Sequence, residues 1–275
     1  MKLLPITSMS MEKVGKSAGS AARDTGSGSA ARAAGPRIGA VVVAAGSGTR
    51  MQSGVKKQFM DFMGKPLVYH AAAALEDSPV QDIILVTGAE DIGYVQRNLV
   101  ENYGFRKVRA VTAGGKERWN SVFAGLSRLA EMGYGERDIV LVQDGARPFL
   151  SREMILRTCA DAEAYGACVA AVRAKDTIKI ADRDGFAEST PDRRLCWQVQ
   201  TPQAFAFGLI LGAYRKLIAD PREQAGITDD AMVVEKEAGR KVRLTEGSYW
   251  NIKITTPEDL PVGEAVYRYL HPEES

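Results

Sequence analysis

Short apolar runs alternate with longer amphipathic runs from Ile38 onward, and this alternation restricts the possible folds of the chain more than any other feature does. This alternation is typical of βαβ units, in which parallel strands share one sheet and helices cover it. We therefore expect an α/β fold that is Rossmann-like, with a mostly parallel twisted sheet and helices on both faces. Ligands of such sheets bind beyond the carboxyl ends of the strands, so residues just after each strand are the ones to inspect.

The expected domain covers residues 38–272. Its strands are expected at residues 39–44, 82–87, 108–112, 138–143, 167–172, 241–244 and 251–254. Its helices are expected at residues 66–76, 91–102, 118–131, 152–165, 204–219, 229–237 and 257–270. The polar segment within residues 173–194 has little core character and is predicted to project as a β-hairpin arm.

Residues 1–37 are rich in Ser, Gly and Ala and show no sustained periodicity, which predicts a disordered leader. An organelle transit peptide is the alternative, but Glu12, Asp24 and the many glycines argue against the amphipathic helix that it needs. A net charge of +2 gives no overall attraction to nucleic acid, and no apolar run approaches the roughly 20 residues of a membrane span. We expect a cytoplasmic protein with neither a nucleic-acid nor a membrane partner.

Cysteine and histidine offer little chemistry. Cys159, Cys168 and Cys196 are far apart without a C-x-x-C pair, so the sequence suggests neither a zinc site nor a disulfide framework. His70 lies in an apolar helical stretch and His271 near the C-terminus, and neither is near a nucleophile signature. The chemistry is therefore expected to proceed without histidine.

The first strand ends in a glycine loop whose members are Ala44, Ala45, Gly46, Ser47 and Gly48. Backbone N–H groups of such a loop form an anion site, and the cations that follow, Arg50, Lys56 and Lys57, can neutralise phosphate oxygens. A P-loop is excluded because Gly64-Lys65 is followed by proline. A dinucleotide-binding loop is disfavoured because the chain lacks both the third glycine and the later acidic residue that such a loop requires. A plain strand-to-helix turn with solvated charges remains the alternative.

Further motifs follow other strands, and each has a structural alternative. Gly115 and Lys116 precede Ser121, which either caps a helix or binds a ribose hydroxyl. The motif Asp144, Gly145 and Arg147 places a carboxylate and a cation at a strand end, where they could bind a ribose, a metal ion or a phosphate. The alternative is an internal ion pair between Asp144 and Arg147. The remaining candidates are Thr201, Thr228 and Lys253. Their structural alternatives are, in the same order, the start of a turn at Pro202, a helix N-cap and a solvated strand residue.

In order along the chain, these motifs read AAGSGTRM, TAGGKERWNSV, QDGARP, DTIK, QTPQAF, ITDDA and NIKITTPEDL. The ordered set resembles the 2-C-methyl-D-erythritol 4-phosphate cytidylyltransferases and covers nearly all of the chain from Ile38 to about Leu270. The resemblance implies a nucleotidyltransferase that uses CTP and Mg²⁺ in isoprenoid precursor synthesis. It also implies a homodimer joined through the β-arm.

The resemblance assigns roles to the motif residues. Arg50 and Lys57 would be catalytic, on either side of the α-phosphate, and Asp144 a tentative ligand of an ion held mainly by CTP. The CTP contacts would be Ala44, Ala45, Gly46, Ser47, Gly48, Gly115, Lys116, Ser121, Asp144, Gly145 and Lys253. The contacts to the sugar-alcohol phosphate would be Arg147, Thr177, Arg193, Thr201 and Thr228, with Arg193 supplied by the other subunit.

Three departures from the family pattern stand out. Lys56 replaces the usual proline before the catalytic lysine, Gln143 and Gly145 replace a histidine and an alanine, and Trp250 replaces an aspartate before Asn251. A ribitol phosphate cytidylyltransferase, which shares several of these motifs, and a nucleotide-binding module without turnover are the alternative functions. Because a phosphate monoester is already nucleophilic near neutral pH, the expected reaction needs positioning and charge neutralisation rather than a general base.

Overall fold

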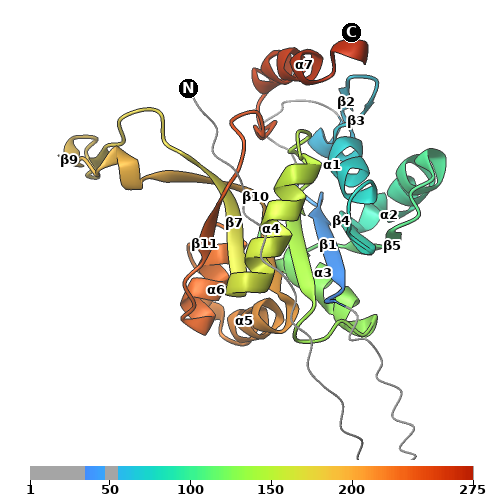
Figure 1. Cartoon of the computed structure of the whole chain (residues 1–275), viewed down its shortest axis with the longest axis horizontal. Helices are drawn as coiled ribbons and strands as arrows, with labels where there is room; N and C mark the ends of the chain where they lie inside the picture. The colour runs from blue at the N-terminus through green and yellow to red at the C-terminus, as the bar shows by residue number, and fades with distance from the viewer. Residues whose placement is uncertain (1–34, 47–54, 275) are drawn as a thin grey trace, which may run out of the picture. The chain divides into compact units, whose positions relative to one another are not determined.

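The computed structural model describes residues 35–46 and 55–274, and those from Pro36 onward form one compact unit. Its centre is a seven-stranded sheet with the order β11-β7-β10-β6-β1-β4-β5 (Figure 1). The strands are β1 Ile38–Val43, β4 Asp82–Thr87, β5 Val108–Ala113, β6 Ile139–Asp144, β7 Ala167–Arg173, β10 Trp197–Ala206 and β11 Arg243–Glu246. Only β10 runs antiparallel to its neighbours in this sheet, so the prediction of a mostly parallel α/β sheet is confirmed.

Helices cover both faces of this sheet. They are α1 Leu67–Glu76, α2 Ile92–Val95 with its π-helical continuation Gln96–Glu101, α3 Arg118–Glu131, α4 Arg152–Tyr165, α5 Phe207–Ala219, α6 Asp230–Ala238 and α7 Asp259–Leu270. Helices α1, α2 and α4 pack on one face, and α3, α5 and α6 pack on the other. Neighbouring residues of β1 point to different faces. Val42 packs in the core under α1, α2 and α4, Val41 packs in the core under α3, α5 and α6, and both are fully buried. This two-sided burial explains the continuous apolar run in the sequence.

The structure corrects the sequence prediction around Pro202. Residues 204–206 were expected to begin a helix, but they complete strand β10, and the helix starts at Phe207. Proline has no N–H for a ladder and, within sheets, is found on edge strands, at the first residue of a strand or at bulges. Here the pairing of β10 with β7 shifts between Val199 and Gln203, and this irregularity accommodates Pro202 inside a strand.

The expected strand at residues 251–254 is also wrong, because these residues join no sheet. The segment is extended, but it is joined to the rest of the domain by isolated hydrogen bonds and not by a strand ladder. One of them is donated by the Ile254 N–H to the Ala146 carbonyl at 2.9 Å. Ile254 is fully buried in a third apolar cluster together with Phe62 and Val266. This packing fixes the segment without a strand partner.

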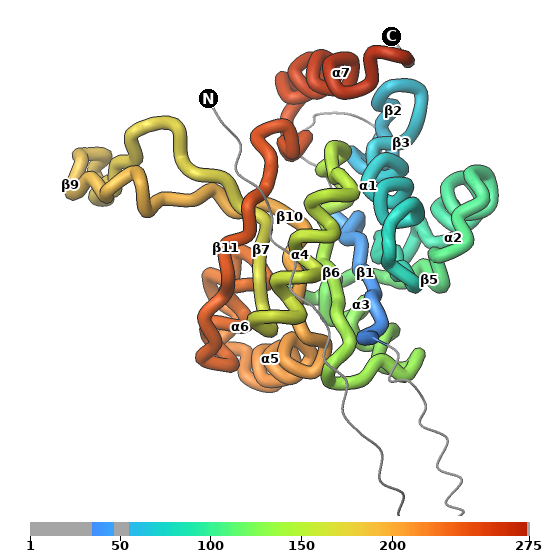
Figure 2. Tube along the Cα trace, viewed as in Figure 1, coloured from blue at the N-terminus to red at the C-terminus, as the bar shows by residue number. Residues whose placement is uncertain are grey.

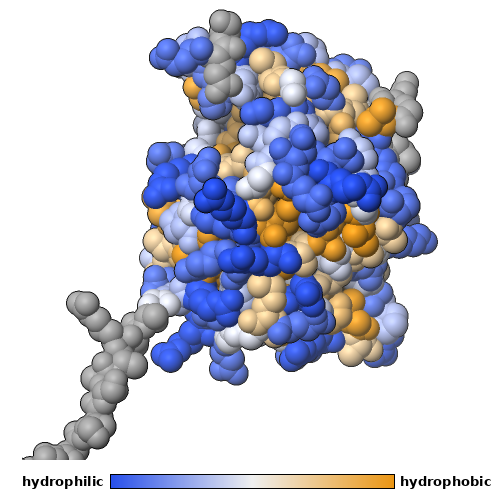
Figure 3. Space-filling view, turned by 90° about the vertical axis from the view of Figure 1, so that its right-hand side faces the viewer, coloured by the Kyte–Doolittle hydropathy of each residue, from blue (hydrophilic) through white to orange (hydrophobic). Residues whose placement is uncertain are grey.

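The third apolar cluster joins α7 to the small hairpin of β2 Asp61–Phe62 and β3 Lys65–Pro66, and Figure 2 shows these segments near each other at one end of the unit. The face turned to the viewer in Figure 3 is largely hydrophilic, with scattered apolar side chains. None of the described helices is long and apolar enough to cross a bilayer.

The expected arm follows β7 and returns into β10. Its base is the pair Arg173 and Trp197, and its outer part is an antiparallel hairpin of β8 Ile180–Ala181 and β9 Ala187–Ser189. Figure 1 shows this hairpin projecting away from the sheet. Phe186 and Leu195 on the arm are 73% and 79% exposed, so the arm presents apolar side chains without packing them in this chain.

Candidate active site

A cavity with a volume of about 640 Å³ lies at the carboxyl ends of β1 and β6. Its floor comes from β1, β6 and the first residues after β1, and its sides come from the start of α3 and from the extended segment around Lys253. The lining residues are Val43, Ala44, Ala45, Gly46, Lys57, Gln58, Gly115, Lys116, Glu117, Arg118, Ser121, Asp144, Ala146, Lys253 and Thr255. Neighbouring strands of a parallel sheet end at the same edge, which is why these distant motifs meet.

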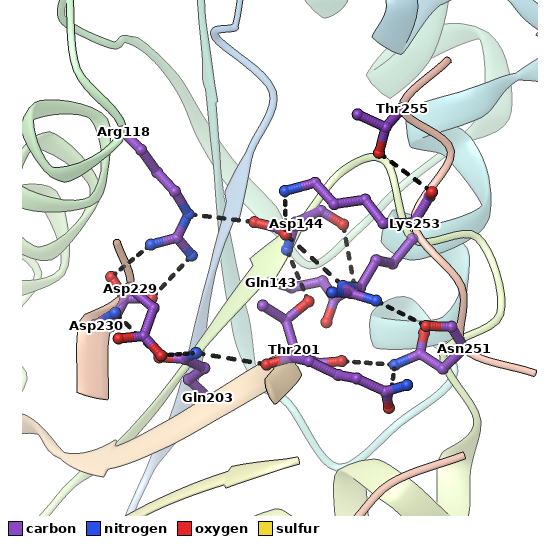
Figure 4. A network of polar contacts seen from close by, with 12 residues as sticks. Arg118, Gln143, Asp144, Thr201, Gln203, Asp229, Asp230, Asn251, Lys253 and Thr255 are labelled. Atoms are coloured by element: carbon purple, nitrogen blue, oxygen red, sulfur yellow. Dashed lines mark hydrogen bonds and ion pairs between the residues drawn. The ribbon is translucent and has the colours of Figure 1, made fainter. Parts of the chain in front are cut away.

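Asp144, the last residue of β6, lies at the centre of the polar residues in Figure 4. Its Oδ2 is 2.8 Å from Lys253 Nζ and 3.7 Å from Arg147 Nε, and its Oδ1 accepts a hydrogen bond from Arg118 Nε at 3.3 Å. Asp144 is only 8% exposed. A single buried carboxylate thus arranges three cations around itself.

These cations decide the ionisation of Asp144. Burial alone raises the pKa of a carboxyl group, but the charges of Arg118, Lys253 and Arg147 outweigh burial and hold the pKa of Asp144 well below its ordinary value. Burial lowers the pKa of Arg147, although the carboxylate of Asp144 opposes that shift. At neutral pH the cleft therefore contains a fixed negative charge at its floor and a surplus of positive charge around it.

A second cavity of about 340 Å³ adjoins the first. Arg118, Asp144 and Lys253 line both cavities, so these residues form the boundary between them. The other lining residues of the smaller cavity are Arg147, Val199, Gln200, Thr201, Gln203, Thr228 and Asp229. The arrangement suits two anionic ligands whose reacting groups meet at a shared cationic boundary.

The side of the larger cavity at α3 depends on two glycines. A side chain at Gly114 would place a Cβ 2.4 Å from Ser121 Oγ, and one at Gly115 would place it 2.4 Å from the Cβ of Asn120. The Gly115 N–H donates to Ser121 Oγ at 3.2 Å. The capping interpretation of Ser121 is wrong, because Glu117 is the N-cap of α3 and forms a capping box with Asn120.

The wall between β6 and the Lys253 segment is a hydrogen-bonded network. Thr201 Oγ1 accepts from the Asp144 N–H at 3.1 Å, and the buried Asn251 side chain donates to the Thr201 carbonyl at 2.8 Å. Arg147 Nη1 donates to the Asn251 carbonyl at 2.8 Å. Thr201 therefore orients the strand end that carries Asp144, in addition to lining the smaller cavity.

Comparison with known proteins gives a consistent result. The sequence model of one family, described as 2-C-methyl-D-erythritol 4-phosphate cytidylyltransferase, matches residues 38–269. A protein of that name from Lachnoclostridium phytofermentans is 44% identical over 232 residues, which are 84% of this chain and 97% of the relative. Another from Lachnospira eligens is 46% identical over 224 residues, which are 81% of this chain and 96% of the relative.

The chain belongs to the 2-C-methyl-D-erythritol 4-phosphate cytidylyltransferase family. A solved structure from Anaerococcus prevotii, named 4-diphosphocytidyl-2C-methyl-D-erythritol synthase, agrees with a TM-score of 0.74 and 32% identity, covering 85% of this chain and 96% of the other. The predicted family, the enzyme class of cytidylyltransferase and the role in isoprenoid biosynthesis are thereby confirmed. The comparisons support the methylerythritol phosphate acceptor over the ribitol phosphate alternative.

The structure of this cytidylyltransferase brings most of the predicted site residues together. The larger cavity contains Ala44, Ala45, Gly46, Lys57, Gly115, Lys116, Ser121, Asp144 and Lys253. The smaller cavity contains Arg147, Thr201 and Thr228. Gly145 lines neither cavity, but its N–H donates to the Val43 carbonyl at 2.9 Å, and a Cβ there would lie 3.1 Å from that oxygen.

Other predicted residues lie elsewhere. Ser47, Gly48 and Arg50 lie outside the described residues, as does the leader except for its last three residues. Thr177 and Arg193 are exposed on the arm and line neither cavity of this chain. Thr228 does not cap α6, because Asp229 is the N-cap and its side chain accepts from the Met232 N–H.

Sequence reasoning missed Arg118 and Asp230. Arg118 contacts Asp144 and also donates to both carboxylate oxygens of Asp230, at 2.9 and 2.8 Å. From the sequence, Asp230 is interpreted as an acid in the first turn of a helix that complements the helix dipole, which accounts for a solvated residue but not for one that is 0% exposed. Nothing in the local sequence indicates a pair separated by 112 positions.

Two departures from the family pattern have partners in this chain. Lys56 forms ion pairs with Glu90 and with Asp91, the latter at 2.6 Å. Trp250 lies against Tyr269 of α7, with ring centroids 5.0 Å apart. Lys56 thus ties the residues before Lys57 to the segment after β4, and Trp250 ties the Lys253 segment to α7.

Proposed function

We propose that the larger cavity binds CTP and the smaller one binds the methylerythritol phosphate acceptor, so that the α-phosphate of CTP and the acceptor phosphate meet at their boundary. The observation that carries this proposal is that Arg118, Asp144 and Lys253 line both cavities. A volume of about 640 Å³ for the larger cavity is within the usual range for small-molecule sites. Its glycine-lined wall lets a base or ribose approach the backbone closely.

In the proposed reaction, an oxygen of the acceptor phosphate attacks the α-phosphorus of CTP in line. The new P–O bond forms as the bond to the β-phosphate breaks, and pyrophosphate leaves. The attacking phosphate carries its own negative charge, so no side chain has to remove a proton. The protein must bring two anions together and stabilise the charge on the five-coordinate phosphorus.

The cations of the cleft are suited to that task. Lys57 lines the larger cavity and Lys253 lines the boundary, so both ammonium groups can approach the triphosphate. Arg147 lines the smaller cavity, where it would bind the acceptor phosphate. Arg50, which lies outside the described residues, is proposed to share the α-phosphate with Lys57.

We propose Mg²⁺ as the cofactor. Mg²⁺ is commonly held by one or two carboxylates together with substrate phosphates, and Asp144 offers one ionised carboxylate to the cleft. The described residues contain no group of three or more His, Cys, Asp or Glu side chains placed to hold a metal ion, so the nucleotide would supply most ligands. When bound, the ion would neutralise triphosphate charge and assist departure of pyrophosphate.

A pyrophosphate-release assay tests this function. The chain should release pyrophosphate from CTP in the presence of methylerythritol phosphate and Mg²⁺, and much more slowly with ribitol phosphate. ATP, GTP and UTP are the controls for the base. Release that is equal for the two acceptors, or independent of any acceptor, would contradict the proposal.

Lys57→Ala tests the catalytic assignment, and we expect turnover to fall on the order of 10²- to 10³-fold. Lys107→Ala is the matched control, because Lys107 donates to the Ser78 carbonyl and lines neither cavity. The control should retain turnover within about twofold, since surface changes away from such sites have small effects. Near-normal turnover of Lys57→Ala would remove the assignment.

We also propose a homodimer that is joined through the arm. The exposed apolar residues Phe186 and Leu195 support this, because large apolar side chains on a projecting hairpin suit burial by a partner. In that dimer Arg193 of the partner subunit would reach the acceptor phosphate. Light scattering should give a dimer for the native chain and a monomer for Phe186→Asp with Leu195→Asp, and a native monomer would refute the proposal.

A cytoplasmic location is the last part of the proposal. The three cysteines of the chain, Cys159, Cys168 and Cys196, are all free of disulfides, which suits a reducing compartment. Burial raises the pKa of both Cys159 and Cys168 to about 12, so these two thiols are poor nucleophiles. Fractionation of cells that express a tagged chain would test the location, and recovery in a membrane or secreted fraction would contradict it.

A further inference from the structure

Asp230 is a buried carboxylate whose two oxygens are both occupied. It is the first residue of α6 and is 0% exposed. Arg118 Nη1 and Nη2 donate to its two oxygens at 2.9 and 2.8 Å, and the hydroxyl of Tyr214 also donates to Oδ1. The Asp230 N–H donates to Gln203 Oε1 at 3.1 Å, so the backbone beneath the carboxylate is fixed as well.

The same guanidinium reaches the cleft through its third nitrogen. Arg118 Nε donates to Asp144 Oδ1 at 3.3 Å, so Arg118 connects two carboxylates that lie on β6 and α6 (Figure 4). A guanidinium is planar and rigid, and a two-pronged contact with a carboxylate fixes the orientation of that plane. The contact with Asp230 therefore determines how Arg118 is presented at the boundary of the two cavities.

Stability alone is a weak explanation for this pair. A buried Arg–carboxylate pair usually adds little stability compared with well-packed apolar residues. The Arg118 side chain also remains 27% exposed, and it lines both cavities, while the Asp230 side chain is fully enclosed. An exposed cation held by an enclosed anion is the arrangement expected when the cation meets a ligand and the anion orients it.

The charges around the boundary support the same conclusion. Arg118, Arg147 and Lys253 bring three positive charges, and all three contact the same carboxylate, that of Asp144. Without Asp230, Arg118 would repel the other two cations and could rotate into either cavity. Asp230 balances Arg118 from behind and does not occupy space that a phosphate needs.

We propose that Asp230 is a positioning residue, which holds Arg118 so that its guanidinium faces the boundary where the acceptor phosphate meets the α-phosphate of the nucleotide. This inference rests on the proposed assignment of the two cavities. Asp230 touches neither ligand and acts through Arg118. Its removal should therefore slow the reaction much more than it weakens the binding of either substrate.

The test is a double-mutant cycle in the pyrophosphate-release assay with CTP and methylerythritol phosphate. Asp230→Asn should lower kcat roughly 10- to 100-fold, which corresponds to about 1.4 to 2.8 kcal/mol, and change each KM less than about threefold. Arg118→Ala should cause a similar loss. In the Arg118→Ala background, Asp230→Asn should cause almost no further loss of kcat, because its only route to the reaction has been removed.

Tyr214→Phe is the matched control. It removes the other side-chain donor to Asp230 and leaves the two bonds to Arg118, so it should lower the melting temperature but leave kcat within about threefold. If Asp230→Asn fails to fold, Arg118→Lys replaces it. A lysine keeps the charge but lacks the two-pronged contact, so its kcat should also fall roughly 10-fold or more.

The outcomes separate two failures. If the native chain releases no pyrophosphate from CTP with this acceptor, the proposed function fails. If the native chain is active, kcat near the native value in Asp230→Asn would overturn the positioning role. Full additivity with Arg118→Ala, or a loss as large in Tyr214→Phe, would overturn it too, because the effect would then be general destabilisation or a path without Arg118.

Discussion

Asp144→Asn separates the electrostatic work of Asp144 from its shape. Asparagine has nearly the same size and keeps one acceptor oxygen, but it removes the charge that Lys253, Arg118 and Arg147 surround. Lys253 and Arg147 would then lose the carboxylate that they contact in the cleft, and Arg118 would keep only its pair with Asp230. We expect the fold to lose stability at neutral pH, in addition to any loss of turnover.

The contacts give the size of the loss. A hydrogen bond to a charged group contributes about 1.5 to 3 kcal/mol, and the lower end applies to Lys253, whose side chain is 37% exposed and screened by solvent. The Arg118 contact is longer, at 3.3 Å, and Arg118 keeps its bonds to Asp230, so it should contribute about 1 kcal/mol. We expect the free energy of unfolding at pH 7 to fall by roughly 2 to 3 kcal/mol.

The pH dependence provides the sharper test. The pKa of Asp144 is depressed in the folded protein, so its contribution is complete above the ordinary aspartate pKa of about 4 and declines as the pH falls toward the folded pKa. Below pH 4, the stability gap between the native chain and Asp144→Asn should therefore narrow by about 1.4 kcal/mol per pH unit.

The assay is urea unfolding followed by circular dichroism at pH 7, 5 and 3. Asp184→Asn is the control for loss of one negative charge, because Asp184 is exposed on the arm. The free energy of unfolding of Asp184→Asn should differ from that of the native chain by less than about 0.5 kcal/mol at every pH. A gap for Asp144→Asn that is the same at pH 7 and pH 3, or absent at pH 7, would refute the electrostatic account.

Three further predictions concern other parts of the chain. Gly114→Ala should weaken CTP binding about tenfold by calorimetry, because its Cβ would lie 2.4 Å from Ser121 Oγ and displace the cavity wall; unchanged affinity would contradict this. Asp82→Asn should lower the free energy of unfolding in urea at pH 7 by about 2 kcal/mol without changing kcat, and this loss should shrink below about pH 4. The reason is that the pKa of Asp82 is depressed, because hydrogen bonds from two arginines and a tyrosine lower it by more than burial raises it. Lys56→Ala should raise the KM for CTP about threefold at low salt and less in 0.5 M salt, since salt screens the ion pair with Asp91, whereas Lys56→Pro should show no such salt dependence.

Local signals were sufficient for the elements that carry them. Strand β4 and helices α3 and α4 have the boundaries that the sequence predicts, 82–87, 118–131 and 152–165. For α4 the reason is visible at both ends. Ser151 accepts from the Met154 N–H at the start, and Gly166 ends the helix with φ of +83°, a left-handed value that favours glycine.

The failures occurred where tertiary partners override local signals. Strand β10 contains Pro202 and is held between β6 and β7, so its pairing depends on two strands that are remote in sequence. Residues 251–254 alternate like a strand but pair with no strand of a sheet, and burial of Ile254 holds them instead. Alternation indicates that one side of a segment is buried, and it does not indicate what covers that side.

The site divides in the same way. Residues at or just after strand ends, such as Asp144 and Gly115, could be selected from sequence because topology alone brings strand ends together. Arg118 could not, because its role depends on Asp230, which another helix supplies from 112 positions away. Residues at strand ends were thus more predictable than side chains whose orientation depends on an enclosed partner from another element.

The substitution at Lys56 shows how a departure from a family pattern can preserve geometry. Proline fixes φ near −65°, and Lys56 has φ of −60°, so the backbone before Lys57 keeps the shape that a proline would impose. Lysine does not impose that angle by itself, so another restraint is needed, and the ion pairs to Glu90 and Asp91 supply it. Restraint by a ring is independent of ionic strength, whereas restraint by partly exposed charges is not. The position of Lys57 in this chain should therefore respond to salt, while in relatives that have the proline it should not.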